Sequence, residues 1–228
     1  MSILQETLFD LKQALQGNLV GTQISAAEDT IRQYAIAAAV SGAVSGLVPG
    51  VAGLLALATQ TGLIWATYVK VNQTLGISMQ ANTAKFLGSA IATNLITSVG
   101  TLLLSYAAAA VISFIPVLGQ AIAATANAAI GYILIYACAV VYLKLITELV
   151  RPDGTIEVAE NDDTKHIIKN ILQKNNMEQL ISEGRNDYKR AKSEGKIDEA
   201  MRNRRCPNCQ EPVEPGQKFC TNCGSALC

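Results

Sequence analysis

The sequence predicts an all-α protein with two helical hairpins, a polar helical extension and a small cysteine-rich module at its C-terminal end. Three observations support this prediction. Residues 33 to 143 hold only two charges, Lys70 and Lys85, and are interrupted by turns that contain proline and glycine. Apolar residues then recur at helical spacing in a charged segment, and four cysteines follow in two C-x-x-C pairs. We expect four parts, which are residues 1–24, 25–149, 150–205 and 206–228.

The first part, residues 1–24, is typical of an amphipathic helix. Its apolar side chains recur every three or four positions, at Ile3, Leu4, Leu8, Leu11 and Leu15. Such a helix either packs on the rest of the protein, which is the simpler interpretation, or lies on a membrane surface.

The second part, residues 25–149, predicts two hairpins made of apolar helices. Ser25 and Glu28 have the spacing of a capping box, which predicts a helix that begins near Ala26. Proline and glycine then end each outgoing helix. The four expected helices run from 26 to the Pro49-Gly50 turn, from 51 to about 75, from 88 to 113 and from 119 to 147.

The low charge of these hairpins predicts an environment other than water. About a quarter of the residues of an ordinary soluble domain are charged. The cations that flank the hairpins all fall at one end, while the turns at the other end carry none. By the positive-inside rule, the termini and the central loop then face the cytoplasm. The pattern fits four membrane crossings, or one full hairpin beside a re-entrant one, and the alternative is a soluble bundle hidden in a complex. The cations are Lys12, Arg32, Lys70, Lys85 and Lys144.

Small and polar residues within the hairpins predict close helix packing. Small residues let helices approach each other in lipid, and Ser, Thr and Asn side chains hydrogen-bond across the interface. We expect Gln60, Asn94 and Asn127 to bond between helices, and a pore or channel is favoured only if these amides line a lumen in an oligomer. The set comprises Ser41, Gly42, Ser45, Gly46, Asn94, Ser98, Ser105, Asn127 and Gly131.

The third part, residues 150–205, predicts two amphipathic helices and a linker near Ser193 to Arg205. His166, the single histidine, lies in the first of these helices, where we expect a surface or half-buried position. The apolar positions that define the two helices are Ile167, Ile168, Ile171 and Leu172, then Met177, Leu180 and Ile181.

The fourth part, residues 206–228, predicts a zinc ribbon. Cys206 and Cys209 form one C-x-x-C, and Cys220 and Cys223 form another. Four thiolates complete a tetrahedral shell around Zn²⁺ with no open position, which makes the metal structural, and disulfide pairing is the alternative. Structural zinc thiolates indicate a reducing compartment. We expect Cys138 to be a buried apolar residue.

Composition argues against two classes of function. The chain has 18 basic and 18 acidic residues, so a nucleic-acid partner is not expected, and the basic run Arg202, Arg204 and Arg205 is interpreted as a solvated face. Neither a P-loop nor a G-x-G-x-x-G motif occurs, and the hairpins are almost without titratable groups, so we do not expect an enzyme.

Two stretches, AAVSGAVSGLVPGVAGLLALATQTGLIWATY (38 to 68) and ISFIPVLGQAIAATANAAIGYILIYACAVVYL (112 to 143), resemble the GTPase-associated helical domain of YcjF-like bacterial inner-membrane proteins. That family usually continues its first PG turn into an acidic residue, where this chain has Val51 and Ala52. The resemblance implies a separately encoded GTPase as partner and a bacterial inner-membrane location, with the termini and the ribbon facing the cytoplasm.

These observations predict a non-catalytic, membrane-associated scaffold or regulatory protein that presents the ribbon as a cytoplasmic docking module. The alternatives are a soluble regulatory module that buries its apolar helices in a complex or homo-oligomer, an oligomeric pore, and a nucleic-acid adaptor that binds through the ribbon.

Overall fold

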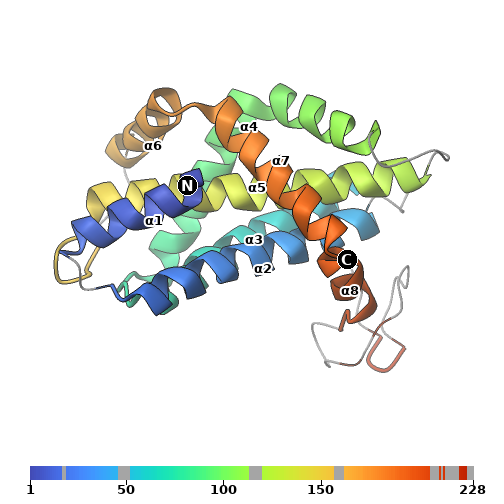
Figure 1. Cartoon of the computed structure of the whole chain (residues 1–228), viewed down its shortest axis with the longest axis horizontal. Coiled ribbons are helices and arrows are strands. Elements are labelled where there is room, and N and C mark those ends of the chain that lie inside the picture. The colour runs from blue at the N-terminus through green and yellow to red at the C-terminus, as the bar shows by residue number, and fades with distance from the viewer. Residues whose placement is uncertain are drawn as a thin grey trace.

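The chain folds into a bundle of helices, which confirms the all-α prediction (Figure 1). A computed structural model describes residues 1–16, 19–45, 52–112, 120–156, 162–205, 211, 213 and 221–224. Within these ranges no extended strand forms, and β-type pairing is limited to two isolated bridges, Ser78 with Thr155 and Val150 with Ile156.

The two predicted hairpins are present as four long helices. They are α2 (Gly21–Ser45), α3 (Ala52–Leu75), α4 (Ala81–Ile112) and α5 (Gln120–Leu149). The bounds of α3 and α5 agree closely with the prediction, whereas α4 begins before the expected residue 88. Both proline-containing turns fall outside the described residues.

The predicted start of the first hairpin is wrong, because α2 begins at Gly21 rather than near Ala26. The expected capping box does not form at Ser25, which lies inside the helix. The Val20 amide instead donates a hydrogen bond of 3.1 Å to Oε1 of Gln23. Glu28 accepts from Arg32, one turn further along, at 2.8 Å. The motif Ser-x-x-Glu here marks a helix interior with an i,i+4 ion pair.

Helix α5 is the centre of the bundle, and the other long helices pack around it (Figure 1). Among the described residues, one segment, Ala124–Leu149, is long and apolar enough to cross a membrane, with a mean hydropathy of 2.1. However, 89% of its apolar window is buried inside the protein. Neighbouring helices therefore cover most of this apolar window of α5.

Helix α1 (Ile3–Ala14) packs on α5, which confirms the simpler of its two interpretations. Ser2 and Gln5 form the capping box at its start. The face defined by Leu4, Leu8 and Leu11 is fully buried, and the helix therefore belongs to the core rather than to a membrane surface.

Helices α2 and α5 approach each other closely at Gly42. A Cβ atom on Gly42 would lie 2.3 Å from the backbone oxygen of Asn127. Near this point Ala38 and Ala39 of α2 and Ala128 of α5 are buried. The prediction of close packing through small residues is confirmed at this crossing, with α5 as the partner of α2 at the contact.

The polar extension forms three helices that pack on the hairpins. These are α6 (Asp162–Lys174), α7 (Met177–Ser193) and α8 (Lys196–Arg202). The predicted apolar faces of α6 and α7 are buried, with Ile167 partly buried at the edge of the core. Residues 196–202 were expected in a linker but form α8, which contacts α2 and buries Ile197 to 1% exposure.

Candidate functional site

A ladder of two tyrosines and two carboxylates joins α5 to α7. The Tyr132 hydroxyl donates to Oδ2 of Asp187 at 2.7 Å, and the Tyr136 hydroxyl donates to Oε1 of Glu183 at 2.5 Å. Both pairs are spaced one helical turn apart, so two consecutive turns of α5 match two of α7. Gly184 lies between the carboxylates, and a Cβ atom there would meet the Tyr136 ring at 3.2 Å. The glycine therefore lets α7 approach α5 closely.

The two tyrosines act as hydrogen-bond donors in a partly dry environment. Burial raises the pKa of Tyr132, and the nearby Asp187 carboxylate raises it further. Burial also raises the pKa of Tyr136, followed by the hydrogen bond to Glu183. Because a raised pKa keeps a phenol protonated at neutral pH, both hydroxyls remain donors to the carboxylates.

Asp187 connects three helices. Its side chain is 7% exposed and, besides Tyr132 of α5, it accepts from Nε of Arg32 on α2 at 3.3 Å and from Arg190 on its own helix. Glu183 extends the connection to a fourth helix, because its Oε2 accepts from the Ile3 amide at the start of α1 at 2.8 Å. The carboxylates of Asp187 and Glu183 thus join α7 to α1, α2 and α5.

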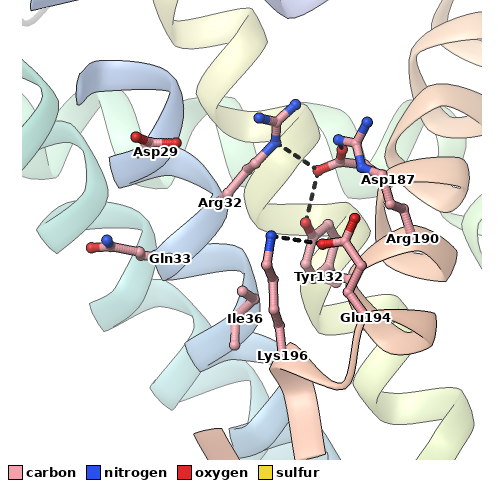
Figure 2. A pocket seen from close by; sticks show the side chains of 10 residues that line it. Asp29, Arg32, Gln33, Ile36, Tyr132, Asp187, Arg190, Glu194 and Lys196 are labelled. Atoms are coloured by element: carbon pink, nitrogen blue, oxygen red, sulfur yellow. Dashed lines mark hydrogen bonds and ion pairs between the residues drawn. The ribbon is translucent and has the colours of Figure 1, made fainter. Parts of the chain in front are cut away.

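A cleft of about 430 Å³ opens beside this network, between α2 and the end of α7 (Figure 2). Arg32, Arg190 and Lys196 point toward it from three helices, and Tyr132 forms its floor (Figure 2). Each cation has a carboxylate partner, which for Lys196 is Glu194 at 2.6 Å. The charges of the cleft therefore cancel, and its side chains hold α7 and α8 against α2.

A second buried polar cluster lies between α3 and α5. The rings of Tyr68 and Tyr142 stack with their centroids 3.9 Å apart. The Tyr68 hydroxyl donates to the Cys138 carbonyl oxygen at 3.0 Å, and the Tyr142 hydroxyl donates to Oδ1 of Asn72 at 2.8 Å. Burial raises the pKa of the Cys138 thiol to about 12, as expected for a buried apolar cysteine.

The three amides expected to bond between helices, Gln60, Asn94 and Asn127, do not form one cluster among the described side chains. The Asn94 amide donates to the Ala90 carbonyl oxygen of its own helix at 2.8 Å, so the expected bond between helices is wrong for this residue. Asn127 faces α2 with its backbone at Gly42. The Gln60 side chain lies outside the described residues. His166 is exposed, which agrees with the expected surface position.

The interhelical bonds instead come from residues that the sequence analysis missed. They include the tyrosines Tyr68, Tyr132, Tyr136 and Tyr142, with Asn72 and the two acids of α7. The signal that could have found them is the i,i+4 spacing of Tyr132 and Tyr136 and of Glu183 and Asp187. Its interpretation required knowing that α5 and α7 are neighbours.

Part of the predicted metal site lies in the described residues. Cys223 ends an exposed turn over residues 221–223, and Gly224 follows at φ +70°, a conformation that glycine adopts without strain. The Val213 amide donates to the Arg204 carbonyl oxygen at 2.9 Å, and Val213 is 4% exposed. Cys206, Cys209 and Cys220 lie outside the described residues, and elsewhere in the described ranges no cluster of metal-binding side chains occurs.

Comparison with known families identifies the C-terminal segment. Residues 205–227 match the model of a zinc-ribbon domain, a class that typically binds zinc. The turn at Cys223 and Gly224 and the thiolate donor set fit this metal. No curated protein and no solved structure matches the chain. The resemblance of residues 38–68 and 112–143 to the YcjF-like domain thus gains no support from these comparisons.

Replacement of Cys220 by serine is expected to release zinc and unfold the ribbon while the helical bundle stays folded. A four-thiolate site provides the folding free energy of such a small module, whereas the bundle has its own apolar core. Zinc content and circular dichroism at 222 nm measure the two effects separately. Serine at Cys138 is the matched control and should leave zinc content unchanged. Loss of the helical signal in the Cys220→Ser protein would contradict two independent modules.

Proposed function

We propose that the protein is a non-catalytic, membrane-associated adaptor that presents its zinc ribbon as a docking module for a protein partner. The observation that supports this proposal is the distribution of charge along the bundle. The ends of α2 and α4, and the starts of α3 and α5, contain no charged residue and lie toward the same end (Figure 1). Of the polar helices, α1 and α6 lie toward the opposite end, whereas α8 packs on α2 nearer this end (Figure 1).

An uncharged end of this size favours contact with hydrocarbon. Residues 86–112 of α4 and 120–131 of α5 carry no ionisable acid or base except the phenol of Tyr106. A water-facing surface of that length normally holds several charges. Lipid or the apolar surface of a partner removes the need for them, and small residues allow the helices to stay packed there.

The ribbon supports the docking part of the proposal. Its predicted ligands, Cys206, Cys209, Cys220 and Cys223, would hold one structural Zn²⁺ in a closed shell with no position for substrate. The ribbon follows directly after α8, which packs on α2, so a partner bound to the ribbon would be kept close to the bundle. A separately encoded GTPase and a position on the cytoplasmic side of a bacterial inner membrane stay part of this proposal.

A soluble regulatory module is the second candidate. Burial of 89% of the apolar window of α5 is what the central helix of a soluble protein would have. In this case the uncharged end would be covered by a second copy of the chain or by another protein.

Flotation with lipid vesicles distinguishes the two candidates. The zinc-loaded full chain should float with vesicles of phosphatidylcholine and phosphatidylglycerol in a density gradient, because its uncharged end binds the bilayer. Replacement of Ala110 by arginine, near the end of α4, should greatly reduce the floated fraction, since a charge within hydrocarbon is unfavourable by about 2.5–3.5 kcal/mol.

The control is arginine at Ala26, an exposed position of α2 in the charged part of the bundle. This variant carries the same change and should float like the unmodified chain. A protein that stays in the lower fractions with vesicles of this composition would contradict membrane association and favour the soluble module.

A further inference from the structure

A methionine lies in the short connection between the two hairpins. Residues 76–80 join α3 to α4 and include Met79. The Ile77 amide donates to the Asn72 carbonyl oxygen at 2.9 Å, and the Ser78 amide donates to the Gly154 carbonyl oxygen at 3.1 Å. These bonds fix the backbone directly before Met79 and keep the connection against the end of α3.

The Met79 sulfur accepts hydrogen bonds from two buried donors. Nδ2 of Asn72 lies 3.7 Å from the sulfur, and the Tyr142 hydroxyl of α5 lies 3.5 Å from it. Asn72 is 5% exposed, and Tyr142 is fully buried and stacked on Tyr68. Burial raises the pKa of Tyr142, so the hydroxyl keeps its proton and remains a donor. Two donors from different helices thus converge on one sulfur atom.

A thioether satisfies these donors poorly. The sulfur of methionine is a weak acceptor, and a buried donor without a good acceptor is unfavourable. The Tyr142 hydroxyl also bonds Oδ1 of Asn72, at 2.8 Å. Within the described residues, however, the Asn72 amide donates to the Met79 sulfur alone. The surroundings of the sulfur therefore favour a stronger acceptor at this position.

We propose that Met79 is a site of reversible oxidation, at which Asn72 and Tyr142 stabilise the sulfoxide. The oxidant is a hydroperoxide. Its O–O bond breaks, one oxygen bonds to the sulfur, and the remaining fragment leaves as an alcohol, or as water when the oxidant is hydrogen peroxide. The thioether loses the two electrons that the peroxide gains. Methionine sulfoxide reductases reverse this reaction, and the inference does not depend on membrane association.

The position of Met79 suits both the oxidant and the product. Met79 is partly buried at the edge of the core, and its neighbours Ser78 and Gln80 are exposed, so a small peroxide can reach the sulfur. Oxidation normally disrupts a core, because it makes an apolar side chain polar. Here the three rotatable bonds of the side chain let the new oxygen turn toward two waiting donors. The sulfoxide should therefore strengthen the contact of the connection with α3 and α5.

Oxidation of the folded protein tests the inference. The full-length, zinc-loaded chain with Met177→Leu and Met201→Leu is treated with tert-butyl hydroperoxide, so that Met1 and Met79 are the remaining methionines. Trypsin releases Met79 in a peptide of residues 71–85, in which mass spectrometry measures the sulfoxide fraction. We expect complete oxidation of Met79 with the helical circular dichroism retained. The urea midpoint of the oxidised chain should be higher than that of the untreated chain.

The matched control carries Met79→Leu in the same background, and its midpoint should not change on treatment, which separates the effect from Met1 and the ribbon thiols. Asn72→Leu should abolish the increase, because the sulfoxide loses a donor. Tyr142→Phe keeps the ring stack and should reduce the increase even if the Asn72 variant does not fold. An unchanged or lower midpoint after oxidation, or oxidation of Met79 only in urea, would overturn the inference. An increase of full size in the Tyr142 variant and in a folded Asn72 variant would overturn it as well.

Discussion

Replacement of Gly42 by alanine is expected to destabilise the bundle by about 3 kcal/mol or more, at the upper end of the effect of overpacking a core. The new Cβ atom would lie 2.3 Å from the backbone oxygen and 2.7 Å from the carbonyl carbon of Asn127. Backbone atoms cannot move aside by changing a rotamer, so α2 and α5 must separate along their interface. Urea denaturation followed by circular dichroism measures the loss as a lower midpoint.

The matched control for this change is alanine at Gly62. This glycine lies in α3, is exposed, and has no atom within 4 Å of the position that a Cβ atom would take. The substitution should stabilise the protein by about 0.5–1 kcal/mol, because alanine loses less conformational entropy than glycine on forming a helix. Equal effects of the two substitutions would show that helix propensity, not the α2–α5 contact, determines the outcome at Gly42.

Replacement of Asp187 by asparagine is expected to lower the free energy of unfolding by about 3 kcal/mol, the lower end of the effect of breaking a buried ion pair. The lower end applies because Arg32, one of the partners, keeps a side-chain exposure of 30%. The amide has the size of the carboxylate but no charge, so Arg32 and Arg190 lose their shared counterion. Tyr132 also loses a charged acceptor. Urea denaturation at neutral pH measures the change.

A double-mutant cycle with Tyr132→Phe separates the parts of this effect. The coupling between the two substitutions should be about 1.5–3 kcal/mol, the range of a hydrogen bond to a charged group. Glu194→Gln is the control, because Glu194 pairs with Lys196 on the surface of the same cleft, and no measurable loss is expected. Additive effects of the Asp187 and Tyr132 variants would contradict the ladder as a stabilising contact.

Local patterns in the sequence predict most of the helices well, but they predict poorly which helices pack against each other. The breaks between α2 and α3 and between α4 and α5, and the apolar faces of α1, α6 and α7, follow from rules that act within a few residues. The early start of α2 was missed because a capping box and an i,i+4 ion pair use the same residue types. The linker expected near Ser193 is helical because Ile197 finds a buried site on the bundle, which its own sequence does not reveal.

The zinc ribbon and the tyrosine–carboxylate ladder differ in the same way: a local pattern predicts the first, whereas the second depends on tertiary contacts. The C-x-x-C pairs predict a zinc ribbon from a spacing that the metal itself requires, and the family comparison identifies that domain. The ladder could not be predicted, because it depends on the position of α7 beside α5, which is a tertiary contact. Composition predicts either crossings or a soluble bundle for the uncharged hairpins, because it does not record that 89% of the apolar window of α5 is covered by protein.

The bond from the Ile3 amide to Glu183 has a consequence for biosynthesis. The two residues are 180 positions apart, so the start of α1 is capped by a side chain made long after it. At about 5–20 residues per second, a ribosome needs roughly 10 to 40 s to cover this distance. For most of that time α5, which ends at Leu149, is also incomplete, and Leu4, Leu8 and Leu11 lack the surface that buries them in the finished protein. The nascent chain therefore exposes an apolar N-terminal segment, which chaperones or lipid can bind, well before the helices that bury it have been made.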